Sequence, residues 1–135
     1  ATDVRFGDAI RLAGYESPPA TVDPSQTLRL TLYWQALSSD IPTGYIVFVQ
    51  LLDASGRLIA QSDAVPAAGA RPANEWLEGE YVTDAHELVW RTTGYSGQGR
   101  LIVGLYDPLT GERLRAADGA DHYALPVGVN VLLGQ

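Results

Sequence analysis

Two glutamates, Glu78 and Glu80, stand two positions apart at the start of an expected strand. Alternate residues of a strand share a face, so the two carboxylates would lie side by side. A carboxylate pair is the chemical requirement of glycoside hydrolysis. Carboxylates that flank a glycine at the start of a strand are more often solvated, and a hydrolase would also need a substrate cleft. A carboxylate-dependent hydrolase is therefore the remote alternative for this chain.

Trp76 stands among acidic and amide side chains in an irregular segment, where it could stack on a sugar ring while its neighbours bind hydroxyl groups. This interpretation predicts a weak ligand-binding site made of Trp76, Glu78, Glu80 and Tyr81. The competing interpretation is that Trp76 folds back as a lid on the open end of the core, and we favour it because large aromatic side chains are mostly buried. Two tyrosines expected to point outward from strands are secondary candidates: Tyr33 and Tyr45.

Other chemistry finds little support in the residue types. The chain has no cysteine, which excludes thiol nucleophiles, zinc-thiolate sites and disulfides. The two histidines, His86 and His122, have no metal-ligand spacing. Aspartates near turns could supply oxygen ligands for Ca²⁺, but none forms the Asp-rich calcium loop; they are Asp53, Asp107, Asp118 and Asp121. We predict no catalytic residues, no metal and no cofactor.

The charge of the chain limits its partners. The formal net charge is −7, all nine basic residues are arginine, and the acidic residues are spread along the sequence. Such a field repels nucleic acid and anionic lipid. No apolar stretch approaches the ~20 residues that span a bilayer, so the chain should not insert directly into a membrane. A chain that begins with Ala1 rather than Met is expected to be a domain excised from a larger protein.

The elements that would position these residues are strands. Apolar and polar residues alternate from Leu28 to Ala36, which predicts a strand with one buried face. Two hairpins are expected at Tyr45–Asp63 and Gly99–Leu114, each with Asp and Gly at its turn. The apolar segment Tyr45–Leu52 should be a central strand, and Tyr81–Trp90 a strand bulged near Asp84.

Ala64–Glu80 contains proline and glycine without periodicity and predicts a long loop that crosses between two layers. First and last strands are expected near Ile10–Tyr15 and Val127–Leu133. This gives about eight strands with glycine and proline between them, typical of a single all-β domain over residues 1–135. The predicted fold is an antiparallel β-sandwich, either immunoglobulin-like or jelly-roll.

An ordered series of segments resembles a β-sandwich domain of bacterial envelope proteins. The segments are Phe6–Asp8 with Leu12 and Gly14–Tyr15; Leu30–Ala36; Val47–Asp53 with Gly56; Ala60–Asp63; Trp76 with Gly79–Glu80 and Asp84; Val103–Asp107; and Thr110–Leu114. In that family the domain is similar to the extracytoplasmic C-terminal part of multi-spanning glycosyltransferases of the dolichyl-phosphate-mannose protein mannosyltransferase type. The resemblance runs from about Val4 to Val131, nearly the whole chain.

The resemblance implies a location and an attachment but supplies no catalytic residues. It predicts an extracytoplasmic accessory domain, tethered in the cell envelope through a membrane protein, with a positioning or interaction role. Its expected partner is the membrane-spanning portion of its own parent chain, with a glycan as a second candidate. The alternative function is a carbohydrate-binding module that uses Trp76.

Overall fold

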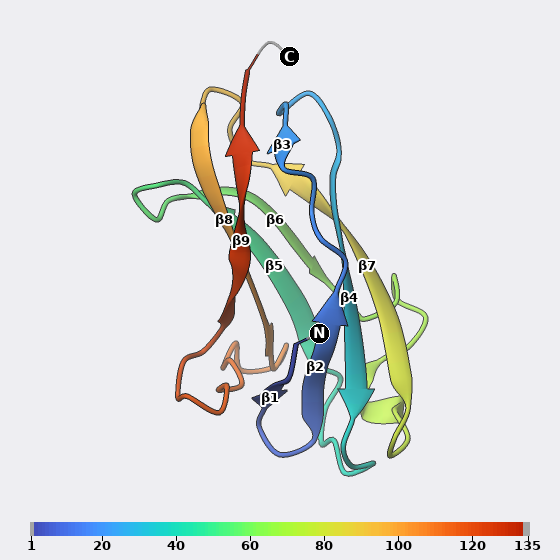
Figure 1. Cartoon of the computed structure of the whole chain (residues 1–135). Helices are drawn as coiled ribbons and strands as arrows, with labels where there is room; N and C mark the ends of the chain where they lie inside the picture. The colour runs from blue at the N-terminus through green and yellow to red at the C-terminus, as the bar shows by residue number, and fades with distance from the viewer. Residues whose placement is uncertain (1, 134–135) are drawn as a thin grey trace.

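The computed structural model describes residues 2–133 and is built almost entirely from β-strands (Figure 1). The strands are, in chain order, β1 Val4–Phe6, β2 Ile10–Tyr15, β3 Thr21–Val22, β4 Leu28–Ala36, β5 Ile46–Leu52, β6 Leu58–Ala64, β7 Tyr81–Trp90, β8 Gly97–Tyr106 and β9 Tyr123–Val131. The one helical segment within the described residues is the short 3-10 helix η1, Ala73–Glu75. The predicted all-β class is confirmed.

The nine strands of residues 2–133 belong to one hydrogen-bonded sheet, in the order β1-β2-β4-β7-β6-β5-β8-β9-β3. Neighbouring strands are antiparallel, except that β3 and β9 run parallel, with Thr21 opposite Asn130. The sequence predicted about eight antiparallel strands in a sandwich of two sheets, and that finer prediction is not confirmed. The two-residue strand β3 was not predicted, because two residues are too few to show a periodic pattern.

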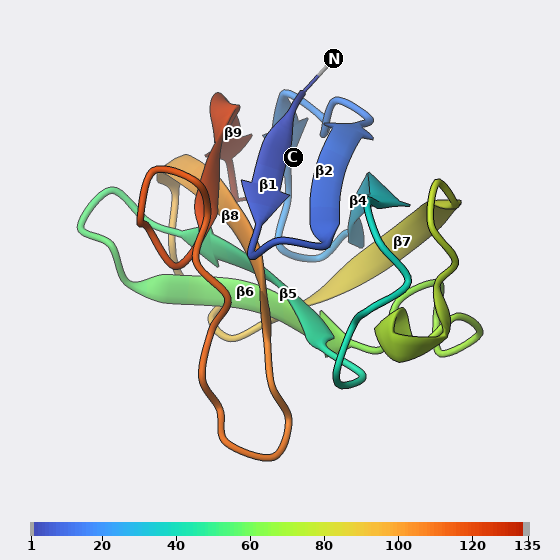
Figure 2. The same cartoon turned by 90° about the horizontal axis from the view of Figure 1, so that it is seen from below.

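The sheet bends where β6 meets β7. These strands pair only through Ala60 with Trp90 and Gln61 with Val89, and then they diverge. The sheet curls at this point, so that the β1-β2-β4-β7 part faces the β5-β8-β9 part, as a half-barrel seen along its length in Figure 2. A single curled sheet can enclose a core much as two packed sheets do.

The enclosed core explains why apolar and polar residues alternate along β4. Its inward side chains are buried and its outward ones are exposed or half-buried, as the sequence predicted; the buried set is Leu28, Leu30, Leu32, Trp34 and Ala36. They join Val49 and Leu101 from the opposite part of the sheet in one apolar cluster. The ring of Phe6 meets Trp34 edge to face, with 5.9 Å between centroids. Burial of each leucine of this set contributes about 1.5–3 kcal/mol.

The first predicted hairpin is confirmed and the second is only partly correct. β5 and β6 pair through a turn in which Gly56 has a φ of +89°, the left-handed conformation that glycine adopts without strain. After β8, the segment predicted to return forms only an isolated bridge between Tyr106 and Arg113. On the side of β8 away from β5, the pairing strand is β9, which begins at Tyr123.

The central position predicted for Tyr45–Leu52 is confirmed, because β5 lies between β6 and β8. Its outward-facing residue Phe48 is only 1% exposed. The ring packs on Gly104 of β8, and the guanidinium carbon of Arg113 lies 4.2 Å from its centroid on the loop side. The segment between β8 and β9 therefore covers part of the outer face of the sheet.

Candidate functional site

Trp76, the predicted sugar-stacking residue, is buried. It follows η1 directly, and its exposed fraction is 1%. The indole Nε1 donates a hydrogen bond to the backbone oxygen of Arg71 at 2.9 Å, and the ring belongs to the main apolar cluster. This is the lid arrangement that we favoured from the sequence. A buried indole cannot stack on a saccharide, so the interpretation of Trp76 as a sugar-binding residue is wrong.

Glu80 is held by the arginine of the same loop. Arg71 donates from Nε to Oε2 at 2.6 Å and from Nη2 to Oε1 at 2.7 Å, and the backbone N–H of Leu77 donates to Oε1 at 3.0 Å. The hydrogen bonds from Arg71, followed by that from Leu77, lower the pKa of Glu80 to about 2. A carboxylate that stays ionised to such acidity cannot serve as the general acid of a glycosidase near neutral pH.

Glu78 does not form the predicted carboxylate pair with Glu80. The strand β7 begins only at Tyr81, and the two glutamates flank Gly79, which has a φ of +85° in a turn. A turn at this glycine removes the alternation on which the prediction of a shared face rested. Glu78 is exposed, and its backbone N–H donates to the hydroxyl of Ser39 at 2.8 Å.

Tyr81 is the one predicted site residue with a large exposed ring. Its exposed fraction is 65%, and it lies opposite Gln35 on the outer face of β4 and β7. The structure thus places Trp76 inside, Glu80 against Arg71, and Glu78 and Tyr81 outside. The four predicted residues do not converge on a common ligand.

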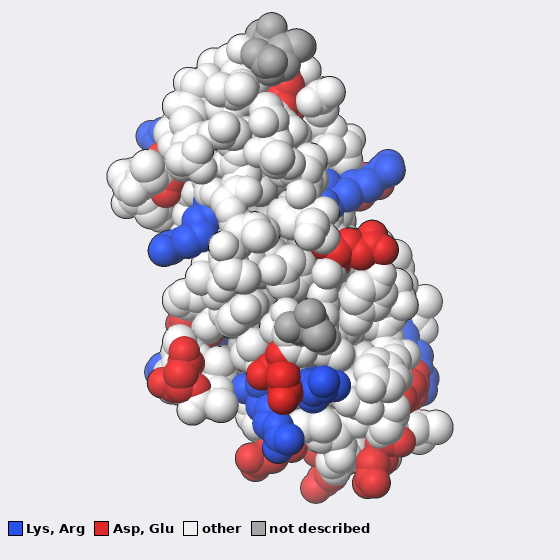
Figure 3. Space-filling model, in the orientation of Figure 1, with Lys and Arg blue, Asp and Glu red and all other residues white. Residues whose placement is uncertain are grey.

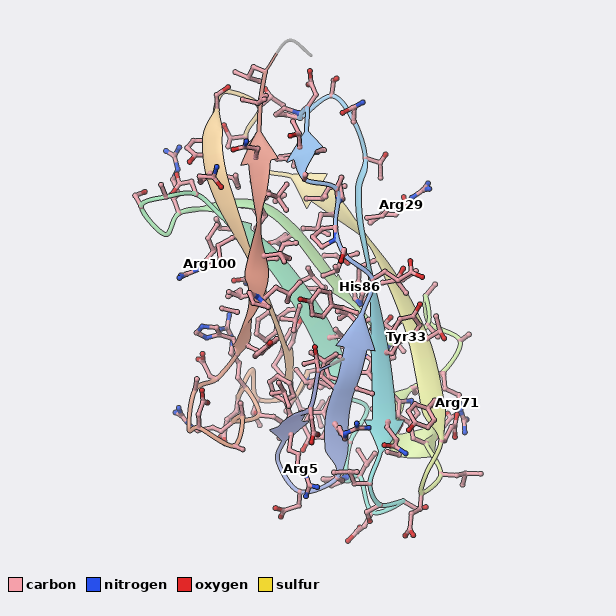
Figure 4. The ribbon with its side chains drawn as sticks, viewed as in Figure 1. Arg5, Arg29, Tyr33, Arg71, His86 and Arg100 are labelled. Atoms are coloured by element: carbon pink, nitrogen blue, oxygen red, sulfur yellow. The ribbon has the colours of Figure 1, made fainter. Side chains whose placement is uncertain are left out.

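A buried polar network that the sequence analysis missed lies between β4, β6 and β7. Nε1 of Trp34 donates to Oδ2 of Asp84 at 3.0 Å, and Nε2 of His86 lies 2.8 Å from the same oxygen. Nδ1 of His86 lies 2.8 Å from the hydroxyl of Ser62. The other oxygen of Asp84 accepts from the backbone N–H of Ala67 at 2.9 Å. Figure 4 labels His86 in this region of the fold.

The order serine, histidine, aspartate resembles the triad of serine hydrolases. In such enzymes the imidazole must reach a bound substrate, whereas the side chain of His86 is 0% exposed and that of Asp84 is 1% exposed. Among residues 2–133 every buried side-chain nitrogen and oxygen has a hydrogen-bond partner. A satisfied buried network fixes the elements that contribute to it. Here it joins β4, β7 and the segment after β6 at the place where β6 and β7 diverge.

The alternating pattern of β7 was a sequence signal for this network, and we interpreted it as a bulge instead. In β7 the inward residues are buried and alternate with exposed ones; the inward set is Val82, Asp84, His86 and Leu88. The predicted bulge near Asp84 is wrong, because the register between β4 and β7 is continuous from Leu28 to Gln35. Two polar residues at consecutive inward positions of one strand must find buried partners.

The turn aspartates bind their own backbone. Oδ1 of Asp53 accepts from the N–H groups of Ser55 and Arg57, at 2.9 Å each, and from the hydroxyl of Ser55 at 2.7 Å. These bonds, with that from the Ser55 hydroxyl largest, lower the pKa of Asp53. Asp107 and Asp118 each accept one backbone N–H in their turns. Within residues 2–133 no group of three or more carboxylates and histidines is arranged to hold a metal ion.

His122 lies in a surface ion-pair cluster, separate from His86. Its Nδ1 is 2.9 Å from Oδ1 of Asp121, which also lies 3.5 Å from Nη1 of Arg113. The hydrogen bond with His122, followed by the charge of Arg113, lowers the pKa of Asp121. Because Arg113 also covers Phe48, this cluster ties the segment before β9 to the outer face of β5.

In the described part of the chain no helix has the length and apolar character needed to cross a bilayer.

Comparison with known proteins gives no family. No family model matches the sequence, and no curated protein matches it. Among solved structures, a β-glucosidase from Listeria innocua, in complex with isofagomine, has a TM-score of 0.48 and 18% sequence identity, over 91% of this chain. This chain spans 16% of the length of that protein. A likeness of this size carries no conclusion about function.

Proposed function

We propose that the chain is a non-catalytic extracytoplasmic accessory domain of a membrane glycosyltransferase-like protein, with a positioning or interaction role. The observation that supports this proposal is that the acid–base groups of the two clusters described above hold parts of the fold together. Asp84 and His86 are held with Trp34, and Glu80 is held by Arg71. Side chains bonded in this way make the domain rigid. The location and the parent protein come from the resemblance of the sequence.

A positioning domain also needs side chains that a neighbour can bury. Leu109, in the turn after β8, is 87% exposed, and Leu77, beside the Trp76 lid, is 63% exposed. Large apolar side chains at loop tips contribute to interfaces when a partner covers them. The partner we propose is the membrane-spanning portion of the same parent chain. The net charge of −7 disfavours nucleic acid in that role.

The experiment compares full-length parent proteins in membranes. One form lacks the domain, one carries Leu77→Ser with Leu109→Ser, and a control carries Thr83→Ala on the outer face of β7. We expect deletion to lower the assembly or the transferase activity of the parent, and the double variant to do so in part, while the control behaves as the wild type. A deletion that leaves both assembly and activity unchanged would contradict the proposal.

The two other functions considered from the sequence receive no support from the site geometry. A carbohydrate-binding module based on Trp76 conflicts with the burial of its indole. A hydrolase based on Glu78 and Glu80 conflicts with the turn between them and with the low pKa of Glu80, about 2.

A further inference from the structure

The open side of the curled sheet holds a groove of about 510 Å³. It lies where the edge of β1 and the first half of β9 approach each other without pairing (Figures 1 and 2). The end of β2 forms its other wall. Pockets for small ligands have volumes of about 300–1,000 Å³, so this groove has the size of a binding site. It is separate from the loop of Trp76 and from the network of His86.

Three tyrosines from three different strands line this groove, which we call the tyrosine groove: Tyr15 of β2, Tyr33 of β4 and Tyr123 of β9. Tyr15 and Tyr123 are partly buried against the apolar core, which fixes their rings. The hydroxyl of Tyr33 donates to Oε1 of Glu16 at 2.7 Å, which holds the third ring. Tyrosine gives a large rigid contact area at low entropic cost and keeps a polar tip.

The polar groups of the groove fit an uncharged ligand with hydroxyl groups. Thr2 and Ser17 contribute hydroxyls to the lining. The one charged side chain in the lining is Asp3, and its carboxylate is neutralised by Nε of Arg11 at 2.8 Å. Figure 3 shows few charged side chains on the upper part of this face apart from its sides, and a central cluster of both signs in its lower half. A strongly ionic ligand would find no unpaired countercharge in this lining.

An added β-strand is the other occupant that an unpaired strand edge suggests, and the sequence of β9 disfavours it. Pro126 lies within β9 on the wall of the groove. Proline has no N–H to donate, so it interrupts the ladder of hydrogen bonds that an incoming strand would make. The groove therefore suits recognition by side chains better than recognition by backbone pairing.

We propose that the tyrosine groove binds a neutral saccharide. The rings of Tyr15, Tyr33 and Tyr123 would meet the C–H faces of the sugar, and the hydroxyls of Thr2 and Ser17 with the Asp3 carboxylate would bind its hydroxyl groups. This inference goes beyond the accessory role, because it assigns the domain its own ligand. It does not depend on the parent protein, so either proposal can fail while the other stands.

The test is a titration of the ¹⁵N-labelled domain with neutral gluco-, manno- and galacto-oligosaccharides, with an oligomer of hexuronic acid as the charged probe. We expect saturable amide shifts at the end of β2 and in the first half of β9 with at least one neutral probe. Tyr33→Ala should weaken that binding about tenfold or more, which corresponds to 1.4 kcal/mol. The control is Val89→Ala, which removes an exposed apolar side chain from the same sheet outside the groove and should leave binding unchanged.

A second variant guards against a loss of folding in Tyr33→Ala. Gly14 lines the groove, its φ is not positive, and a Cβ there would contact Tyr33 at an ordinary 3.9 Å. The backbone therefore accommodates a Cβ at this position. The longer side chain of Gly14→Leu should obstruct the groove with a similar loss of binding, and its amide spectrum checks that the fold is kept. The proposal is overturned if no neutral probe gives saturable shifts at concentrations up to about 10 mM. At that concentration a site with a Kd of about 1 mM would be almost fully occupied. It is also overturned if the charged probe binds more tightly than every neutral probe, or if Val89→Ala weakens binding more than Tyr33→Ala does.

Discussion

The indole of Trp34 and the carboxylate of Asp84 are joined by a 3.0 Å hydrogen bond inside the core. Both residues are fully buried, and the bond crosses diagonally between β4 and β7, because Trp34 lies opposite Val82 and Asp84 lies opposite Leu32. A carboxylate is tolerated at such depth only when donors surround it. Trp34 thus helps to satisfy the most deeply buried acid described, and Asp84 in turn fixes the orientation of a large core ring.

Replacement of this acid should be strongly destabilising. Asp84→Ala leaves the indole N–H of Trp34 and the backbone N–H of Ala67 without their acceptor, and we expect the free energy of unfolding to fall by about 3–5 kcal/mol. Urea denaturation measures the change. The control is Thr83→Ala, an exposed neighbour on the same strand, which should stay within about 0.5 kcal/mol. Equal effects of the two substitutions would show that the network does not contribute to stability.

The clamp between Glu80 and Arg71 predicts a dependence of stability on pH. The pKa of Glu80 is lowered in the folded protein to about 2 from an ordinary value of 4.5, so its contribution is present above pH 4.5 and is lost as the pH falls toward 2. Both side chains are partly exposed, which weakens the pair by solvent screening. We therefore expect Glu80→Gln to cost about 1–2 kcal/mol at neutral pH.

Denaturation of wild type and Glu80→Gln across this pH range measures the difference between them. The gap should narrow as the pH falls from 4.5 toward 2. Glu78→Gln is the matched control, because Glu78 is exposed and lies in the same loop. A gap that stays constant with pH would contradict the assignment of the low pKa to Glu80.

Local periodicity and turn chemistry made part of the fold predictable from the sequence. The alternation from Leu28 to Ala36 and the turn around Gly56 were both predicted, because a buried face and a positive φ each impose a residue type at a fixed position. The sequence did not show that β9 rather than the segment around Arg113 pairs with β8. Which segment pairs with β8 depends on tertiary contacts between residues far apart in the sequence, and a local sequence pattern does not reveal such contacts.

The candidate sites show the same limit. The sequence singled out Trp76 in its loop, either as a sugar-stacking residue or as a lid on the core. Its burial depends on Arg71 and on the core beneath it. The tyrosine groove joins residues far apart in sequence, such as Tyr15 and Tyr123, through the curl of the sheet. Among the three tyrosines of the groove only Tyr33 had been singled out, as a secondary candidate on an outward strand position.

Burial of Trp76 predicts a structural rather than a binding phenotype. Trp76→Ala should lower the free energy of unfolding by about 3–5 kcal/mol, because it removes a large ring from the core. Trp76→Phe should cost less, since it keeps most of the ring volume and loses the bond to Arg71. Saccharide titration of the folded Trp76→Phe domain provides the second readout, and its affinity should match the wild type. A loss of saccharide binding in this variant, with stability preserved, would restore Trp76 as a ligand-binding residue.

Gly104 should not tolerate a side chain, whereas Gly14 should. A Cβ at Gly104 would lie 2.5 Å from Cζ of Phe48, and the ring cannot move away freely because Arg113 covers it. We expect Gly104→Ala to cost about 1–3 kcal/mol by overpacking. Gly14→Ala is the matched control, with its nearest contact at 3.9 Å. Thermal unfolding of both variants measures the difference, and equal melting temperatures would show that Phe48 is not confined as described.

The resemblance of Ser62, His86 and Asp84 to a hydrolase triad can be tested directly. Ser62 lies 2.8 Å from an imidazole nitrogen, which is close enough for proton transfer, but the side chain of His86 is 0% exposed. We expect a fluorophosphonate probe to leave Ser62 unlabelled in the folded domain, because the imidazole cannot approach both the serine and a bound phosphonate. Intact-mass spectrometry measures labelling, with Ser62→Ala as the control. Labelling that depends on Ser62 and disappears in His86→Gln would contradict the non-catalytic proposal and make this network an active site.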